Sequence, residues 1–237
     1  MDTAVIPPFV APDALTGQAP IVVLAPHPYD EILGCGCLLA YAFAHDGAQF
    51  ICMTDGGASH PGSKDWPPAR LSAARRSELC NAVTCLGGTP ADVTWLDHPD
   101  GWLGAQNQGA IAARISAICR DLGARHLFAS AKQDHHEDHK STARIAGLVA
   151  AAVPGLTHFA YPVWSRHDDP NLLTHIAHHR PQAIDPAPAS ARKRAAISAN
   201  ATQLGGVITD DPAGFSLRPG LIEMFIQTPE IYWKVTA

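Results

Sequence analysis

The chain has 237 residues, of which 46% are hydrophobic, so it is long enough to bury a sizeable core. Its formal net charge is −5 and it has no basic run of the kind that tracks phosphates, which argues against nucleic acid as a partner. The longest apolar run is too short to span a bilayer and the N-terminus lacks a secretory pattern, so we expect a cytoplasmic protein with no membrane partner.

The sequence pattern alternates between strands and helices over most of the chain. Continuous apolar runs indicate buried strands, and apolar residues at helical spacing indicate amphipathic helices. In chain order the pattern predicts a strand at 21–25, a helix at 31–45, strands at 48–54 and 92–96 separated by a helix at 69–88, then a helix at 108–123, a strand at 126–130, a helix at 139–152 and a strand at 157–163. This order is typical of a mostly parallel sheet with helices on both faces.

The two ends of the chain are less regular. Residues 1–20 are rich in proline and alanine and are predicted to form a loose arm. After residue 164 the pattern weakens, and we expect only a helix at 190–201 and a short strand at 222–227. We predict one α/β domain over residues 1–237, a Rossmann-like three-layer fold whose part at 165–237 is the less regular one.

Polar side chains follow four of the predicted strands. The clusters are His27 to Glu31 after the first strand, Asp55 to Gly57 after the second, Asp97 to Gly101 after the third, and Asp134 to His139 after the fourth. In open parallel sheets, ligands bind beyond the carboxyl ends of the strands. The sequence therefore predicts a single active site at this edge of the sheet.

Two of these clusters have residues that bind metals. His27 and Asp30 are three residues apart at one strand-to-helix turn, and His136 and His139 are three apart at another. Two histidines and one carboxylate, with water in the fourth position, are typical of a hydrolytic zinc site. An isolated histidine after a strand is usually an ordinary hydrogen-bonding residue, so the prediction depends on both clusters lying at the same edge.

Two other patterns, a pair of cysteines and a pair of glycines, do not indicate a metal site or a nucleotide site. Cys35 and Cys37 point in different directions on a helix, and the six cysteines, which lie in apolar segments, are expected to be buried thiols. Gly34 and Gly36 do not complete a dinucleotide-binding motif, because position 39 is Leu39. A nucleotide-binding domain is therefore disfavoured, and small residues that pack a helix on the sheet are the better interpretation.

The segment PHPYDE at 26–31 resembles the first motif of the PIG-L/LmbE-like zinc-dependent N-deacetylases, which is normally His-Pro-Asp-Asp-Glu. The segment HEDH at 136–139 resembles their second motif, His-x-Asp-His. The segments TDGGASHPGS and ARRSELCNAVTCLGG also resemble family segments, in the correct order. The resemblance covers residues 20–165 well and the remainder loosely.

The resemblance implies a zinc-dependent enzyme that removes acetyl from an N-acetylglucosamine-type sugar or glycoconjugate. It implies that His27, Asp30 and His139 bind Zn²⁺. It also implies that His136 stabilises the oxyanion or protonates the leaving amine. Asp138 would orient His136 and adjust the charge of its imidazole ring.

The resemblance implies further roles. Arg75 matches the arginine of an Arg-x-x-Glu helix that contacts the sugar, and Asp100 would hold sugar hydroxyls. Glu31 would brace the turn, since a carboxylate is favoured in the first turn of a helix. Relatives often form trimers or hexamers, which implies a homo-oligomer.

The chain departs from the family at Tyr29, where the family has its general-base aspartate. A phenol has an ordinary pKa near 10 and is a poor base at neutral pH. Three interpretations remain open. Another group, Asp134, Glu137 or His136, takes over as base; or the chain is a silent zinc- and sugar-binding protein; or Tyr29 is an altered residue in an ordinary enzyme.

Two segments bear on the substrate side of the site. Asn200 and Ala201 stand where relatives often carry a histidine and an arginine, which puts substrate contacts from that helix in doubt. The segment 59–68, dense in Gly and Pro, is either a surface loop or a wall of the sugar site. His178 and His179 are expected on a solvated face.

Overall fold

The computed structural model describes residues 6–236. In chain order its elements are α1 (Pro12–Thr16), β1 (Ile21–Ala25), α2 (Asp30–Ala44), β2 (Ala48–Thr54), α3 (Pro68–Leu86), β3 (Val93–His98), α4 (Gln108–Leu122), β4 (His126–Ser130), α5 (Glu137–Ala152), β5 (Thr157–Tyr161), α6 (Ser165–Asp168), α7 (Leu172–Ile176), β6 (Gln182–Ile184), α8 (Ser190–Ser198), α9 (Pro219–Gln227) and β7 (Glu230–Lys234). Short 3₁₀ turns include η3 (Ala177–His179) and η5 (Ala201–Gln203). Within the predicted arm, α1 is helical, and residues 1–5 lie outside the described part.

The strands form one seven-stranded sheet in the order β3-β2-β1-β4-β5-β7-β6. The first five are parallel to one another, and β7 pairs antiparallel with β5 and β6. The predicted α/β fold with a mostly parallel sheet is confirmed, and five of the six predicted strands and all five predicted helices are present to within a few residues. Because β1 lies between β2 and β4, the chain reverses its winding direction there, which opens a crevice at the ends of β1 and β4.

The predicted strand at 222–227 is wrong, because these residues belong to the helix α9. The segment is short and apolar, and such a run fits a buried strand and a buried helix equally well. Pro219 occupies the first turn, where its fixed φ favours a helix. The strand of this region is β7, which follows α9 and was not predicted.

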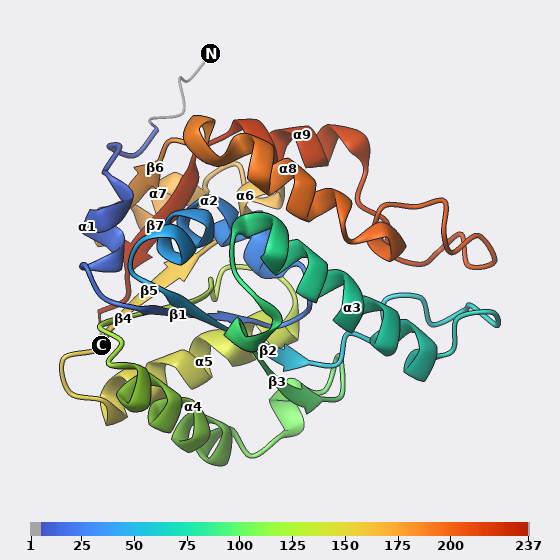
Figure 1. The fold of residues 1–237 in the computed structure, drawn as a ribbon, viewed down its shortest axis with the longest axis horizontal. Helices are drawn as coiled ribbons and strands as arrows, with labels where there is room; N and C mark the ends of the chain where they lie inside the picture. Colours follow the sequence, from blue (N-terminus) through green and yellow to red (C-terminus); the bar gives the residue numbers. More distant parts are fainter. Residues whose placement is uncertain (1–5, 237) are drawn as a thin grey trace.

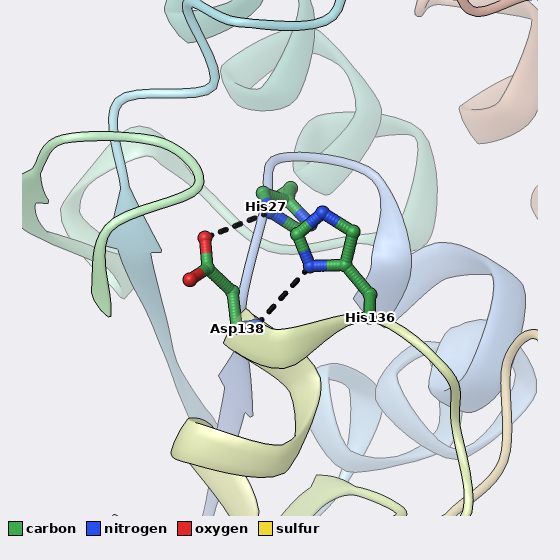
Figure 2. A group of neighbouring side chains, drawn as sticks. All are labelled: His27, His136 and Asp138. Atoms are coloured by element: carbon green, nitrogen blue, oxygen red, sulfur yellow. Dashed lines mark hydrogen bonds and ion pairs between the residues drawn. The ribbon is translucent and has the colours of Figure 1, made fainter. Parts of the chain in front are cut away.

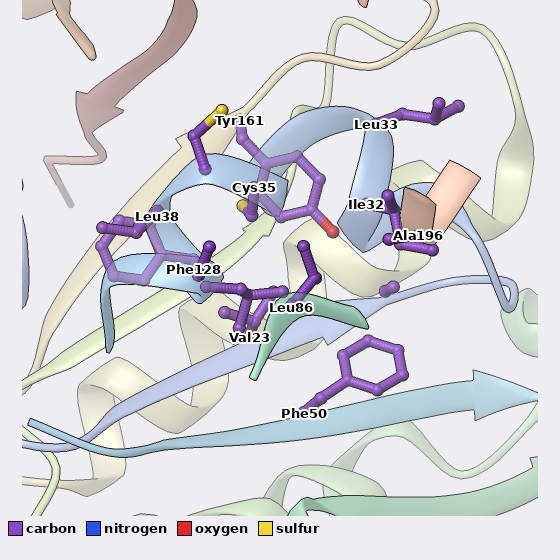
Figure 3. Close-up of a cluster of buried hydrophobic side chains, with 14 of the residues drawn as sticks. Val23, Ile32, Leu33, Cys35, Leu38, Phe50, Leu86, Phe128, Tyr161 and Ala196 are labelled. Atoms are coloured by element: carbon purple, nitrogen blue, oxygen red, sulfur yellow. The ribbon is translucent and has the colours of Figure 1, made fainter. Parts of the chain in front are cut away.

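Helices cover both faces of the sheet (Figure 1), with α4 and α5 on one side and α2, α3, α8 and α9 on the other. The alternation of side chains along β1 explains the two cores. Val22 and Leu24 pack with residues of α4 and α5, whereas Ile21 and Val23 pack with residues of α2 and α3. Figure 3 shows part of the second core, where Phe50, Phe128 and Tyr161 meet α2.

Small residues let α2 approach the sheet and α8, as predicted for Gly34 and Gly36. A Cβ atom at Gly34 would lie 2.2 Å from the Tyr161 ring, and one at Gly36 would lie 3.1 Å from the Lys193 side chain. Lys193 is fully buried and forms an ion pair with Glu230 at 2.6 Å, which joins α8 to β7. The C-terminal segment is thereby fixed against the helix that begins at the crevice.

The structure also bears on the predictions about the cysteines and about membrane spans. All six cysteines are free, and four of them are buried. Among the described residues, no helix combines the length and the apolar character that crossing a bilayer requires.

Candidate functional site

The crevice contains a pocket of about 360 Å³, lined by residues from three of the four predicted polar clusters, by Ala58 and Ser59 just after the second cluster, and by the C-terminal segment. His27 and Asp30 enter it from the end of β1, Asp100 from the end of β3, and His136 from the end of β4. The loop after β1 is fixed from below, because Thr54 donates to the Pro26 carbonyl from both its backbone N–H, at 3.0 Å, and its hydroxyl, at 2.8 Å.

The Asp30 carboxylate lies between two histidines. Its Oδ2 atom is 3.0 Å from Nδ1 of His27 and 3.2 Å from Nε2 of His139. The same oxygen accepts the backbone N–H of His27 at 3.1 Å. Asp30 and His139 are buried and His27 is nearly so, so these three ligand atoms face one another in a site largely closed to solvent.

Each of these histidines also contacts a carboxylate on its other ring nitrogen. Nδ1 of His139 contacts Asp134 at 2.8 Å, and Nε2 of His27 contacts Asp100 at 3.1 Å and Asp138 at 3.3 Å. Histidines that bind metals are typically held in this way, with one nitrogen on the metal and the other N–H donated to a carboxylate. The arrangement leaves Nδ1 of His27 and Nε2 of His139 aimed at Asp30.

The buried Nε2 of His139 faces the Asp30 carboxylate but makes no well-aligned hydrogen bond within the described residues. A buried polar atom is rarely left unpaired, and a cation between His27, Asp30 and His139 would satisfy it. The three residues therefore fit a metal ion with nitrogen and oxygen ligands. A second group of close ligand atoms, His27, His136 and Asp138, fits less well because its carboxylate and one imidazole are already bonded elsewhere.

The electrostatics of the site favour positive charge. Burial lowers the pKa of His139, but Asp30 and Asp134 outweigh it and raise that pKa to about 9. Burial raises the pKa of Asp30, and the two histidines outweigh it and hold the pKa well below its usual range. A site that stabilises protons on histidine in this way also stabilises a metal cation in their place.

His136 lies beside His27, with the ring centroids 4.7 Å apart (Figure 2). Its Nδ1 atom accepts the backbone N–H of Asp138 at 3.2 Å, so in the neutral ring the proton is on Nε2. Burial, followed by the charges of His27 and His139, lowers the pKa of His136. His136 therefore offers a neutral ring with an N–H donor at the pocket.

The Asp138 carboxylate does not contact the imidazole of His136. It accepts the backbone N–H groups of Gly101 at 2.7 Å and Leu103 at 3.0 Å, and it lies against His27 (Figure 2). The predicted orientation of His136 by Asp138 comes instead from the backbone N–H of Asp138. The carboxylate fixes the loop after β3 and the ring of His27.

Tyr29 occupies an unusual backbone conformation at the start of α2, with φ of 113° and ψ of −32°. Such an outlier in a non-glycine residue costs about 1–3 kcal/mol and clusters at functional sites. Its hydroxyl is buried without a partner, and burial together with Glu31 raises its pKa far above the ordinary value. Tyr29 therefore stays protonated at neutral pH.

Glu31 contacts the backbone of the same turn, as the sequence indicated. Its Oε2 atom accepts the N–H of Tyr29 at 2.9 Å, and the side chain is fully buried. Burial raises the pKa of Glu31 to about 8.

Arg75 is buried behind the pocket wall and joins two of its loops. It donates to the carbonyl of Gly56 at 2.6 Å and to that of Pro28 at 2.7 Å. Its Nε atom is buried without a partner, and the residue lines the pocket. Arg75 therefore has a bracing role that the sequence did not indicate, and its sugar contact stays a prediction.

Two residues considered as substitute bases lie outside the pocket. Asp134 is fully buried behind His139 and also accepts from the N–H groups of Val163 and Ser165. Glu137 is exposed and pairs with Lys140 at 2.7 Å. Neither carboxylate lines the pocket.

The outer wall of the pocket was not predicted. It is formed by Trp164 after β5 and by Phe215 and Gln203 from the C-terminal segment, with Trp164 and Phe215 in an edge-on contact at 5.6 Å between centroids. Trp164 and Phe215 lie in segments without a motif, so only the folded structure brings them to the site, whereas Gln203 closely follows Asn200 and Ala201, whose segment the sequence already linked to the substrate. From the loop at 59–68, Ser59 reaches the pocket, whereas His60 and Trp66 do not line it.

Solved structures share this fold. The N,N'-diacetylchitobiose deacetylase of Pyrococcus horikoshii matches with 20% identity and a TM-score of 0.68, over 91% of this chain and 83% of that one. The deacetylase of the A40926 pseudoaglycone matches with 19% identity and a TM-score of 0.65, over 92% and 97%. GalB, the 4-carboxy-2-hydroxymuconate hydratase of Pseudomonas putida, matches with 17% identity and a TM-score of 0.64, over 87% and 82%.

The sequence comparisons point to one family. No curated protein matches the chain significantly. The model of the family described as PIG-L, GlcNAc-PI de-N-acetylase, matches residues 22–150, which is more than half of the chain and contains both histidine clusters. The chain therefore belongs to the PIG-L family.

Proposed function

We propose that the protein is a zinc-dependent hydrolase that removes the N-acetyl group from an N-acetylglucosamine-type sugar or glycoconjugate. The observation that carries the proposal is the pair of histidines that face Asp30, each bonded from behind by a carboxylate. Family membership, together with structural neighbours that are deacetylases of N,N'-diacetylchitobiose and of the A40926 pseudoaglycone, supports the reaction class. A single domain, a homo-oligomer and a cytoplasmic location remain predictions.

His27, Asp30 and His139 would hold the zinc ion. When bound, zinc supplies a Lewis acid that polarises the acetamide carbonyl and makes water more acidic. The protein holds the ligands ready for it, because Asp134 and Asp138 fix the two imidazole rings. The hydrolysis breaks the amide C–N bond and gives acetate and the free amine of the sugar.

His136 would act on the substrate oxygen and nitrogen. Its Nε2–H is free because Nδ1 is used in the contact with the Asp138 backbone. A neutral donor of this kind stabilises negative charge on the carbonyl oxygen and can pass its proton to the leaving amine.

No other group at the pocket is an efficient general base in place of the family's aspartate. The protonated phenol of Tyr29 is not a base, and Asp134 and Glu137 lie outside the pocket. Asp100 remains as a carboxylate that lines the pocket outside the ligand set. Burial raises its pKa, but His27 and the N–H of Ala58 outweigh this and lower it to about 2, so Asp100 is a weak base. We therefore propose slow turnover by the native protein.

The second candidate is a zinc- and sugar-binding protein without turnover. It is favoured by Tyr29 itself, since loss of a general base typically costs about 10²–10⁴-fold in rate. Both candidates share the metal site and the pocket, and they differ only in whether acetate is released.

The test is acetate release from a panel of N-acetylglucosaminides by zinc-loaded native protein and by the Tyr29→Asp variant. We expect slow release by the native protein and faster release by the variant, by about 10²-fold or more. Release by the variant alone would establish the silent binding protein. Release by neither, in samples that bind zinc, would contradict the proposed reaction.

A further inference from the structure

A second cavity, of about 150 Å³, lies on the α5 side of the sheet, between α5, η3 and the strands β5 and β7. Figure 1 shows these two strands side by side near the C-terminus. None of its lining residues also lines the pocket that contains His27 and Asp30. The cavity is large enough for several water molecules, but it is much smaller than a typical pocket for a drug-sized ligand.

The lining of this cavity is cationic in a chain of net charge −5. Lys132 from the loop after β4 and Arg144 from α5 supply two positive charges, His158 from β5 and His179 from η3 add imidazole rings, and no Asp or Glu is among the lining residues. Among residues 6–236, neither Lys132 nor Arg144 forms an ion pair, and the nearby Glu137 is paired with Lys140. The positive charges at the cavity are therefore not neutralised by the protein.

Two buried polar atoms at the cavity lack partners among residues 6–236. Nε2 of His158 is unpaired, and this side chain is 5% exposed. The amide oxygen of Gln133 is also buried and unpaired, and rotating the amide by half a turn would present its NH₂ donors instead. Leaving such groups unpaired is costly, and with the Gln133 amide turned and the His158 proton on Nε2 both groups would donate to an occupant that accepts hydrogen bonds.

We propose that this cavity binds a small oxyanion of the phosphate class, either free or as the phosphate group of a small monoester. Lys132 and Arg144 supply charge-assisted donors, and His158 supplies a donor from the buried wall. The volume admits one such group with a few water molecules. The proposal does not depend on the deacetylase reaction.

The cavity is connected to the metal site through the chain. Lys132 and Gln133 directly precede Asp134, whose carboxylate holds Nδ1 of His139. An anion bound to Lys132 and Gln133 would therefore order the segment that positions a metal ligand.

The test is isothermal titration of the full chain with inorganic phosphate, and separately with glycerol phosphate, in a chloride buffer of low ionic strength. We expect saturable binding of at least one of them, weakened about tenfold or more by Lys132→Gln and by His158→Gln. Binding of glycerol phosphate in preference to phosphate would identify the ligand as a monoester.

The matched control is Arg120→Gln, which removes one positive charge from an exposed position on α4 outside the cavity. It should bind phosphate as the native protein does. Two results would overturn the proposal: no binding of either compound by the native protein at millimolar concentration, or equal weakening by Arg120→Gln and Lys132→Gln. Lys132 is exposed, so its variant is expected to fold.

Discussion

At the position of the family's general base, the structure has a phenol whose pKa is raised by burial and by Glu31, so that it stays protonated at neutral pH. The hydroxyl of Tyr29 is buried without a partner, while the backbone N–H of Tyr29 is held by Glu31. The side chain therefore fills space and contributes no charge to the site. The turn therefore keeps its conformation without a carboxylate at this position.

We predict that Tyr29→Phe leaves folding and turnover unchanged. The substitution removes only an unpaired hydroxyl, so the free energy of unfolding should stay the same or rise by up to about 1 kcal/mol. Urea unfolding and acetate release of the two proteins measure this. A loss of turnover by more than tenfold would show that the phenol takes part in the reaction.

We predict that Asp134→Asn weakens zinc binding by about 10–100-fold, because the variant loses the charge that holds Nδ1 of His139. The matched control is Asp169→Asn, which changes a similar pair with the exposed His175 at 2.9 Å. Competition with a zinc-binding dye measures both affinities. Equal affinities in the two variants would remove Asp134 from the metal site.

The sequence predicted the residues of the inner pocket but not those behind them. His27, Asp30, Asp100 and His136 follow the ends of strands, a position that the alternating pattern reveals. The bracing role of Asp134 depends on the direction in which His139 points, and Trp164 and Phe215 arrive from irregular segments. Such contacts depend on tertiary packing, for which the local pattern carries no signal.

At the scale of elements, the four βα units that build the site were predictable, and the C-terminal addition was not. The parallel strands are buried on both faces and so read as continuous apolar runs. By contrast, α9 and β7 are short apolar elements separated only by Thr228 and Pro229. Helix and strand are indistinguishable there from periodicity alone.

The close approach of α2 to the sheet gives a prediction for Gly34. We expect Gly34→Ala to lower the free energy of unfolding by about 1–3 kcal/mol, because the new Cβ would lie 2.2 Å from the Tyr161 ring. The matched control is Gly147→Ala in α5, where nothing lies within 4 Å and helix propensity should add up to about 1 kcal/mol. Urea unfolding compares the two, and destabilisation of both alike would contradict the packing argument.

At the scale of the whole molecule, the fold does not decide the reaction. Two of the neighbours described above are deacetylases and a third is a hydratase, at similar TM-scores. The function is therefore inferred from the pocket, where the N–H donor of His136 and the proposed metal ligands face each other.

The global stability should depend on pH through His158. Burial lowers the pKa of this side chain to about 4 in the folded protein, where Lys132, Arg144 and His179 surround the same cavity. The unfolded chain takes up a proton near pH 6.5 and the folded protein does not, so stability is lost as pH falls from about 6.5 to 4, by about 3 kcal/mol.

The variant His158→Gln should lack this part of the pH dependence, whereas the exposed His178→Gln should retain it. Unfolding free energies at pH 7.5 and pH 5 in phosphate-free buffer measure the difference between each variant and the native protein. Parallel pH profiles for all three proteins would contradict the role of His158.

The most direct test of the central claim is the zinc stoichiometry of purified, chelator-stripped protein at a controlled free zinc concentration. The metal centre of His27, Asp30 and His139 predicts one zinc ion per chain in the native protein and in the His175→Ala control, and none in His139→Ala. Native protein without zinc, or a His139→Ala variant that binds zinc as the native protein does, would contradict the account.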